Sequence, residues 1–305
     1  MFSDDELRFV HDIGDSVKYR YEIIDKIGKG TYSNVVLCKD HKENKSVALK
    51  MFRNFSRGRY NNYTKEVKIL NYLKSKIKSS EECFITEILD NFKFRDHEFI
   101  TTKLYNNNLY KDRIKIYNST IDNKLTIIYD IFKALNFLRS GRPKIIHGDL
   151  KPENILFKTK ELFNIVICDF GLSETLNGDY IEYKSLIQTR FYRAPEIIYK
   201  IPFNEKIDIW SAGCIIYEII EDKALFKCKK ESDLLVYYHF ILNKPDTNYI
   251  NSHLNIIKIY NNISSYDSLN VYRKPGNLSI VLDKFLAIDQ SKANREDMIM
   301  YYLVK

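Results

Sequence analysis

An aspartate, a lysine and an asparagine share the short segment "IIHGDLKPENILF", residues 145–157. The Asp149 carboxylate could accept the proton of a hydroxyl group, or orient that hydroxyl for attack. Just beyond it, Lys151 could neutralise a transferring phosphoryl group, and the amide oxygen of Asn154 could bind a hard divalent cation. A buried structural loop has no need of three such groups pointing the same way. The segment therefore indicates group-transfer chemistry.

A further carboxylate lies downstream, in "ICDFGLSE". Asp169 directly follows a run of apolar, β-type residues, where its side chain could bridge a magnesium ion between phosphate oxygens. Gly171 would allow the turn that follows. Asp169 and Asn154 are thus the candidate metal ligands.

A glycine-containing stretch, "IGKGTYSNVV" at residues 27–36, lies between two β-type runs. Gly28 and Gly30 would let the backbone approach a bulky anion closely, with N–H groups free to face phosphate oxygens. Ser33 stands where the G-x-G-x-x-G pattern has its third glycine, so this stretch alone favours an ordinary hairpin turn. No helical pattern opens directly after the loop, which disfavours a dinucleotide-binding fold of the Rossmann type.

Lys50 ends the β-type run "VALK" on the following strand. Most lysines at strand ends are simply solvated, but a lysine placed under a glycine loop could hold the α- and β-phosphates of a nucleotide. Such a lysine must itself be held in place. Glu66, in the helical pattern "YTKEVKIL", could do that, with Leu70 one turn further on facing the core.

The elements that must position these residues fall into two groups. Up to about residue 104, β-type runs at residues 21–28, 34–40, 46–52 and 98–104 predict a small sheet, and one helical pattern at residues 63–76 interrupts them. Longer helical patterns follow at residues 125–140, 208–220 and 232–242, with short strand candidates at residues 154–157 and 165–169. We therefore expect an N-terminal extension (1–20), a β-rich lobe (21–104) and a mainly helical lobe (105–305), joined near residues 103–105.

Composition narrows the class of protein. The 305 residues are 45% hydrophobic and 29% charged, as in a soluble globular protein with an ordinary core. We expect an intracellular protein, because the chain has no long apolar run and no signal-peptide pattern. The five scattered cysteines contain no C-x-x-C pair, which argues for reduced thiols. The formal net charge of +8 comes from dispersed lysines, so we expect a solvated basic surface and no direct nucleic-acid binding.

Six segments, "GKGTYSNV", "VALK", "HGDLKPEN", "DFG", "APE" and "DIWSAGC", occur in the order and spacing of the signature set of eukaryotic protein kinases. The chain resembles that family from about residue 21 nearly to its C-terminus. The resemblance implies an α+β, bilobal kinase fold with ATP and Mg²⁺ in the cleft between the lobes. It also implies a nucleotide site, with Thr102 as a small gatekeeper and Leu104 as the hinge contact. The residues assigned to that site are Ile27, Gly28, Lys29, Gly30, Thr31, Tyr32, Ser33, Asn34, Val35, Ala48, Lys50, Thr102, Leu104 and Leu156.

The implied reaction is in-line transfer of the γ-phosphoryl group of MgATP to a protein hydroxyl. Asp149, Lys151, Lys50 and Glu66 are the implied catalytic residues, and His147, Phe170 and Leu70 match the apolar stack of active kinases. Kinase-like proteins without activity typically lack one of the catalytic or metal-binding residues. This chain has all of them, so an ATP-binding scaffold is a remote alternative.

The segment "SLIQTRFYRAPEII" resembles the CMGC group of serine/threonine kinases. Thr189 matches the threonine that contacts the catalytic aspartate and lysine, and Arg190 and Arg193 belong to the loop that receives the residue after the phosphoacceptor. Within the group, "HGDLKPENILF" and residues 20–50 are most similar to the LAMMER (Clk-type) kinases, with features of the SR-protein kinases and of the DYRK and HIPK branch. That likeness implies transfer to serine and threonine of Arg/Ser-rich splicing factors, with tyrosine reached by autophosphorylation, and a monomer in the nucleus or cytoplasm. A DYRK-like or other CMGC kinase acting on non-splicing substrates is the alternative.

Two segments depart from the LAMMER pattern. The motif that names the family would fall at residues 233–242, where only apolar spacing survives, and the expected partner of Glu196 becomes Lys292 or Arg295. Gly148 stands where many kinases carry an arginine that binds a phosphate on the activation segment. LAMMER, DYRK, HIPK and SR-protein kinases likewise place a small residue there. Gly148 therefore predicts activity without phosphorylation of that segment.

Overall fold

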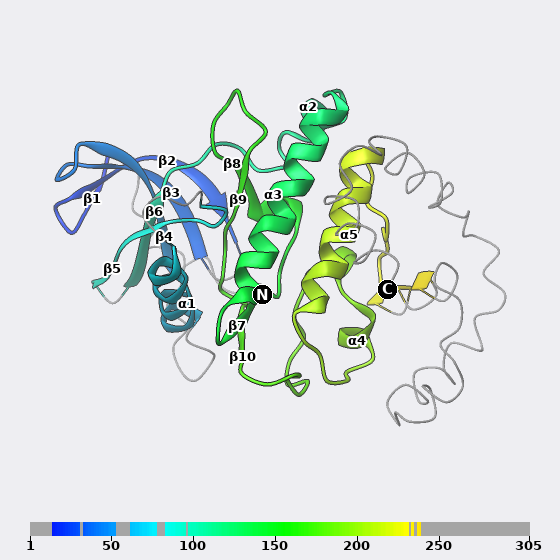
Figure 1. Cartoon of the computed structure of the whole chain (residues 1–305). Helices are drawn as coiled ribbons and strands as arrows, with labels where there is room; N and C mark the ends of the chain where they lie inside the picture. The colour runs from blue at the N-terminus through cyan, green and yellow to red at the C-terminus, as the bar shows by residue number, and fades with distance from the viewer. Residues whose placement is uncertain are drawn as a thin grey trace.

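The computed structural model describes residues 14–30, 33–52, 62–77, 83–95, 97–231, 233–234 and 237–238. Within these ranges the chain forms a β-sheet with one helix beside it, followed by a larger, mainly helical region (Figure 1). This is the bilobal α+β architecture expected from the sequence. The domain boundaries at residues 20 and 104 remain predictions, and Lys292, Arg295 and most of the helical pattern at 232–242 lie outside the described residues.

The sheet of the first lobe is antiparallel throughout, with strand order β1-β2-β3-β4-β6-β5. Its strands are β1 (Ser16–Val17), β2 (Tyr21–Lys29), β3 (Ser33–Asp40), β4 (Lys45–Phe52), β5 (Ile88–Phe94) and β6 (His97–Lys103). Four of them match the predicted β-type runs. The sequence reading did not include β5, whose "ILDNFKF" mixes apolar and polar residues, but its antiparallel pairing with β6 makes it the edge of the sheet.

Alternation along β4 places different side chains on the two faces of the sheet. Val47, Leu49 and Met51 are buried in an apolar cluster with Tyr21 and other residues of the sheet. Ala48 and Lys50 point to the opposite face, where Ala48 pairs with Thr102 of β6. The same strand therefore supplies core residues on one side and candidate nucleotide-site residues on the other.

Helix α1 (Asn62–Lys76) follows the predicted helical pattern. Its buried residues recur at helical spacing: Tyr63, Glu66, Ile69, Leu70 and Leu73. Glu66 is the one charged residue on this apolar face, which is costly without an ionic partner. Lysines in the last turn complement the negative end of the helix dipole.

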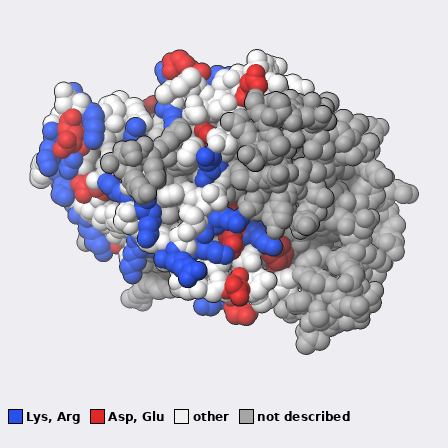
Figure 2. All heavy atoms as spheres, viewed as in Figure 1, with Lys and Arg blue, Asp and Glu red and all other residues white. Residues whose placement is uncertain are grey.

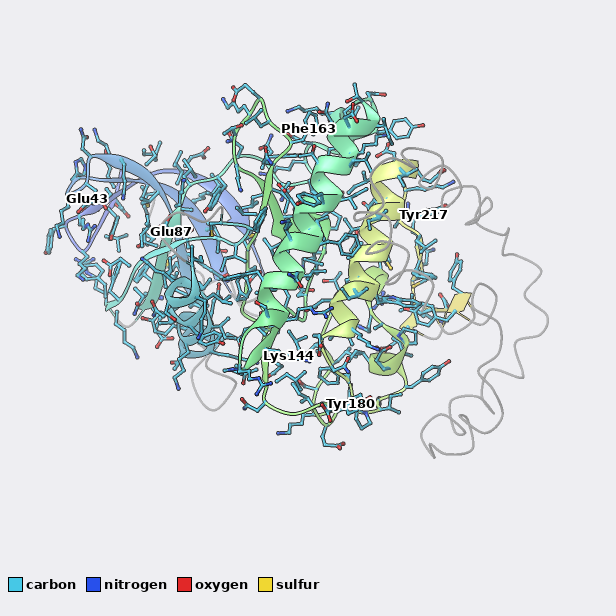
Figure 3. The ribbon with its side chains drawn as sticks, in the orientation of Figure 1. Glu43, Glu87, Lys144, Phe163, Tyr180 and Tyr217 are labelled. Carbon is cyan, nitrogen blue, oxygen red and sulfur yellow. The ribbon has the colours of Figure 1, made fainter. Side chains whose placement is uncertain are left out.

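The second lobe is organised around two long helices, α3 (Ile121–Ser140) and α5 (Lys206–Glu221), with the short helices α2 (Arg113–Tyr117) and α4 (Pro195–Ile198) near them (Figure 1). The Thr120 side chain caps α3 by accepting from the backbone N–H of Asn123. Two small sheets pair β8 (Ile155–Phe157) with β9 (Ile165–Ile167), and β7 (Lys144–Ile146) with β10 (Glu174–Leu176). Phe163, between β8 and β9, packs edge-on against Phe157 near α3 (Figure 3).

The link between the lobes runs beside β8. After β6 ends, the backbone N–H of Asn106 donates to the carbonyl of Phe157, and the N–H of Leu109 donates to the carbonyl of Ile155. One large apolar cluster then includes residues of α1, α3, β8, β9 and α5. Helix α1 of the first lobe thus shares a core with the segments that carry the polar residues of the second.

On the face shown in Figure 2, the described residues carry their positive charge in a dispersed form. Figure 2 shows Lys and Arg spread over the sheet and over the lower part of the visible face, with Asp and Glu between them. Among the helices in the described part of the chain, none has both the length and the apolar character needed to cross a bilayer.

Candidate active site

Asp149 lies at the centre of a hydrogen-bonded group between β7 and β8. Its Oδ1 accepts from the Thr189 hydroxyl at 2.7 Å, and its Oδ2 accepts from the Lys151 ammonium at 2.7 Å. Lys151 also donates to Thr189 Oγ1 at 3.0 Å, so the three side chains form a closed triangle. Only a tenth of the Asp149 side chain is exposed. An aspartate that already accepts from one hydroxyl group, beside a lysine, has the geometry needed to orient a second hydroxyl.

The two predicted metal ligands are neighbours in space. Asn154 donates its amide nitrogen to the Asp149 backbone carbonyl at 2.9 Å, which leaves its Oδ1 as the atom suited to a cation. The Asn154 backbone carbonyl accepts from the N–H of Cys168, the residue before Asp169. Mg²⁺ needs only one or two protein oxygens when phosphates and water complete its shell. Asn154 and the partly exposed Asp169 carboxylate fit that requirement.

Lys50 connects the sheet, helix α1 and the segment after β9. Its ammonium donates to both Glu66 oxygens, at 2.8 and 2.7 Å, and to Asp169 Oδ1 at 2.8 Å. The Glu66 side chain is only 4% exposed, whereas that of Asp169 is 45% exposed. The ammonium therefore compensates the buried carboxylate and also fixes the more accessible one, leaving Asp169 Oδ2 for a ligand.

One ammonium shared by two carboxylates shifts all three pKa values. Burial favours neutral Lys50, but Asp169 and Glu66 outweigh it and raise the Lys50 pKa. Removal of water would raise the pKa of Asp169, but Lys50 lowers it to about 2. Burial dominates at Glu66, and although Lys50 opposes it, the pKa rises to about 7. Glu66 is thus the carboxylate that takes up a proton most readily near neutral pH.

The glycine loop lies at the turn between β2 and β3. Gly28 pairs with Val35 beside a register irregularity, and the Gly30 N–H donates to the Ser33 carbonyl at 2.8 Å. A side chain at Gly30 would meet that carbonyl at 3.3 Å, so the glycine keeps the turn tight. The Lys111 ammonium, from the region before α2, reaches the Ile27 carbonyl at 3.5 Å.

The remaining predicted nucleotide-site residues come from the sheet and from β8. Lys29, Ser33, Asn34 and Val35 lie on the two strands that flank the loop, and Leu104 and Leu156 lie where the link passes β8. Ala48 and Thr102 face one another across β4 and β6. Thr31 and Tyr32 lie outside the described residues.

The loop between β7 and β8, residues 147–154, carries Asp149 and is anchored by Asp208, a buried residue in the first turn of α5. Its Oδ2 accepts from the His147 backbone N–H at 2.6 Å, and its Oδ1 accepts from the Gly148 N–H at 3.0 Å. Burial raises the Asp208 pKa, although these bonds oppose it. Ser173 donates its hydroxyl to the His147 carbonyl. Asp149 is therefore held through its two predecessors rather than by its own side chain alone.

His147 is fully buried and has the packing role expected of it. Its ring lies edge-on to Phe170 with 5.0 Å between centroids, and Phe170 and Leu70 belong to the same apolar cluster. The Asp149 N–H points at its Nδ1 and the Cys168 carbonyl lies 3.0 Å from its Nε2. Both ring nitrogens are thus occupied, which leaves neither for proton transfer to a substrate.

Gly148 is required by the backbone geometry, because no residue with a Cβ atom fits its position without strain. Its φ is +74°, and a Cβ there would lie 2.7 Å from the Leu172 carbonyl oxygen. We expect Gly148→Ala to destabilise the fold by about 2 kcal/mol or more, lowering the melting temperature by several degrees, and to reduce activity. Thermal unfolding measures the first effect. Gly178→Ala is the matched control, because nothing lies within 4 Å of its Cβ position, and equal effects of both variants would contradict this account.

The segment before α4 is held by Gln188 and Arg193. Gln188 has a left-handed φ of 65° and connects Ile207, Ser211 and the Ala194 N–H through its side-chain amide. The buried Arg193 guanidinium donates to the Gln188 carbonyl and, at 2.9 Å, to Glu231. The Arg193 guanidinium is thus fully engaged by backbone carbonyls and by the Glu231 carboxylate of the same chain.

Sequence reasoning did not assign roles to Asp208, Gln188 and Glu231. Asp208 is the first letter of the quoted "DIWSAGC" motif, so the motif carried a signal for it. Gln188 and Glu231 carried none, because their roles depend on contacts between segments distant in sequence. Glu196 is half-buried, and burial raises its pKa; both predicted partners for it lie outside the described residues.

A glycine loop over a sheet, a lysine fixed by a helical glutamate and an aspartate–lysine–asparagine loop define a nucleotide-dependent phosphotransferase site. The family model "Protein kinase domain" matches residues 21–292, and the chain belongs to that family. Its membership of the family, inferred above from six short motifs, is confirmed.

Several dual-specificity and serine/threonine kinases are similar to this chain in sequence. The chain is 35% identical over 253 residues to the human dual specificity tyrosine-phosphorylation-regulated kinase 4, covering 82% of this chain and 47% of that protein. Human dual specificity tyrosine-phosphorylation-regulated kinase 3 is 36% identical over 246 residues, with coverages of 80% and 41%. A Dictyostelium discoideum protein described as a serine/threonine-protein kinase is 37% identical over 243 residues, with coverages of 78% and 26%. The chain thus spans less than half the length of these relatives.

Proposed function

We propose that this protein is an active kinase that transfers the γ-phosphoryl group of MgATP to serine and threonine hydroxyls of proteins. The observation that carries the proposal is the triangle of Asp149, Lys151 and Thr189, in which the aspartate already accepts from a threonine hydroxyl. Its relatives named above are serine/threonine or dual-specificity kinases, which supports the same acceptor class.

In this mechanism the chain mainly positions groups and neutralises charge. Asp149 orients the acceptor hydroxyl and takes its proton, while Lys151 lies where it can stabilise charge on the transferring group. Lys50, held by Glu66, would bind the phosphates of the nucleotide. Bound Mg²⁺, held by Asn154 and Asp169, would supply further positive charge to the phosphate oxygens. The buried anchors at Asp208 and Gln188 keep these groups in place before substrate arrives.

Two substrate classes are suggested by two different sequence similarities of this chain. The LAMMER-like motifs point to Arg/Ser-rich splicing factors, and the dual-specificity relatives point to a DYRK-like kinase with other substrates. The first class needs acidic groups to receive arginines. Glu153, Asp179 and Glu182, the candidates for that role, are all exposed. The second class is supported by the named relatives, and we favour it.

The test is a transfer assay with purified protein and MgATP. An Arg/Ser-repeat peptide is compared with a Ser-Pro peptide and with autophosphorylation, including phosphotyrosine detection. We expect transfer to serine, and preference for the Arg/Ser peptide would restore the splicing-factor class. ATP binding without transfer to any peptide or to the protein itself would instead favour a scaffold.

Activity without a phosphate on the activation segment is a separate expectation. Gly148 offers no cation to such a phosphate, and Arg193 already has Glu231 as its anionic partner. Replacing Tyr180 and Tyr183 by Phe and Ser185 by Ala should therefore leave most of the activity, measured as kcat/KM on a peptide. Tyr180 is 65% exposed at the lower edge of the molecule, so its loss removes no core contact (Figure 3). Collapse of activity, with rescue by a phosphomimetic residue, would contradict this interpretation.

A further inference from the structure

A strip of four basic side chains lies beside the candidate active site. The chain that follows α5 runs back along that helix, so that Phe226 stacks on Trp210 with 5.7 Å between ring centroids (Figure 1). The segment "KCKKE", residues 227–231, then meets the loop that contains Thr189. We call Arg190, Lys227, Lys229 and Lys230 the cationic strip, and all four side chains are exposed.

Two contacts fix the strip next to the catalytic group. Arg190 donates through Nη1 to the Lys229 carbonyl at 2.6 Å, and Arg193 donates to Glu231 at 2.9 Å. Arg190 directly follows Thr189, whose hydroxyl is bonded to Asp149. Neighbouring Cα atoms are about 3.8 Å apart, and the arginine side chain adds its own length. The Arg190 end of the strip therefore lies on the order of 10–15 Å from the Asp149 carboxylate. That distance corresponds to about three to five residues of an extended peptide.

The charge of the strip is not cancelled by its immediate surroundings. Within the described ranges, none of the four cations forms an ion pair. Glu231 is already paired with Arg193, and Asp233, which accepts from the Lys230 backbone N–H at 3.1 Å, sets one negative charge against the four positive charges of the strip. A substrate side chain passing here therefore meets net positive charge.

We propose that the cationic strip is a subsite for an anionic side chain of the protein substrate. This inference rests on the proposed kinase function and names its substrate class: serine or threonine with an acidic or phosphorylated residue about three to five positions away on one flank. Carboxylates and phosphates share the required charge and oxygen acceptors. Arginines of an Arg/Ser repeat on that flank would instead be repelled.

The experiment compares kcat/KM for matched peptides. All peptides share one otherwise uncharged sequence around a single serine. Three to five positions from that serine, on one flank or the other, each peptide carries two Asp, two Ala or two Lys residues. A further peptide carries phosphoserine there. We expect one flank to show a preference for Asp over Ala of about three- to tenfold, which added salt reduces. Phosphoserine above Asp would identify previously phosphorylated substrates, whereas equal rates would identify acidic sequences.

The charge-reversal variant Lys229→Glu with Lys230→Glu should remove the Asp preference and favour the Lys peptide on the same flank. The matched control reverses two exposed lysines of the first lobe, Lys39→Glu with Lys42→Glu, and should keep the wild-type ratio. Peptide binding by fluorescence anisotropy in the presence of MgADP repeats the comparison without catalysis. It therefore separates failure of this subsite from failure of the kinase function. An Asp-to-Ala ratio near one on both flanks, or a ratio unaffected by the strip variant, would overturn the proposal.

Discussion

Asp149→Asn is expected to lower kcat by a factor of about 10²–10⁴. The amide cannot take a proton from a substrate hydroxyl. Its NH₂ group would also face either the Lys151 ammonium or the Thr189 hydroxyl, each of which now donates to an Asp149 oxygen. The KM for ATP should change little, because the lost groups contact the acceptor side of the site. Steady-state phosphorylation of a serine peptide gives both constants.

The control for this variant is Asp222→Asn, which changes the same charge at an exposed carboxylate that follows α5. Its rate should equal that of the wild type. Retention of full activity by Asp149→Asn would remove the central residue of the proposed mechanism. Loss of activity in both variants would point to an effect of net charge instead.

Lys50→Met should lower kcat/KM by about 10²–10³, because it removes a preorganised cation from the phosphate site. The structure adds a consequence for stability that the sequence did not suggest. Glu66, at 4% exposure, loses its ammonium partner while Asp169 remains nearby. Since the pKa of Glu66 is already raised to about 7, this carboxyl should bind a proton rather than stay charged without a partner. The variant should therefore fold.

The pH dependence of the stability of Lys50→Met tests whether Glu66 binds a proton in this variant. A carboxyl whose pKa is raised in the folded state binds more protons there than in the unfolded chain, so stability falls as pH rises toward the raised pKa. The melting temperature of Lys50→Met should drop more than that of the wild type between about pH 6 and about pH 8. Adding Glu66→Gln should remove the extra drop. Lys45→Met, on the exposed start of the same strand, should match the wild type in rate and in pH dependence.

Local patterns were sufficient to predict the elements that carry the site. The alternation in "SVALKMF", the helical spacing of Glu66 and Leu70, and the long apolar patterns of α3 and α5 all correspond to elements of the structure. These are properties of residues close together in the chain, where periodicity alone decides which face is buried. The kinase fold could be predicted for the same reason, because its motifs are short and ordered.

Contacts between distant segments could not be predicted in the same way. The pairing of β7 with β10 joins two short strands with little β pattern of their own, and the Arg193–Glu231 ion pair spans residues with no shared motif. The sharing of Lys50 between Glu66 and Asp169 also depends on three separate elements meeting. Such contacts follow from tertiary packing, which one sequence does not encode in any local window.

The double hydrogen bond from Asp208 to the backbone of residues 147 and 148 has a consequence for protein engineering. Because the loop's geometry is fixed from α5, a graft that moves residues 145–157 into another scaffold would transfer the chemical groups without their orientation. The transplantable unit is the loop together with the first turn of α5 and the glycine at 148. Designs that borrow this site should treat the two segments as one part.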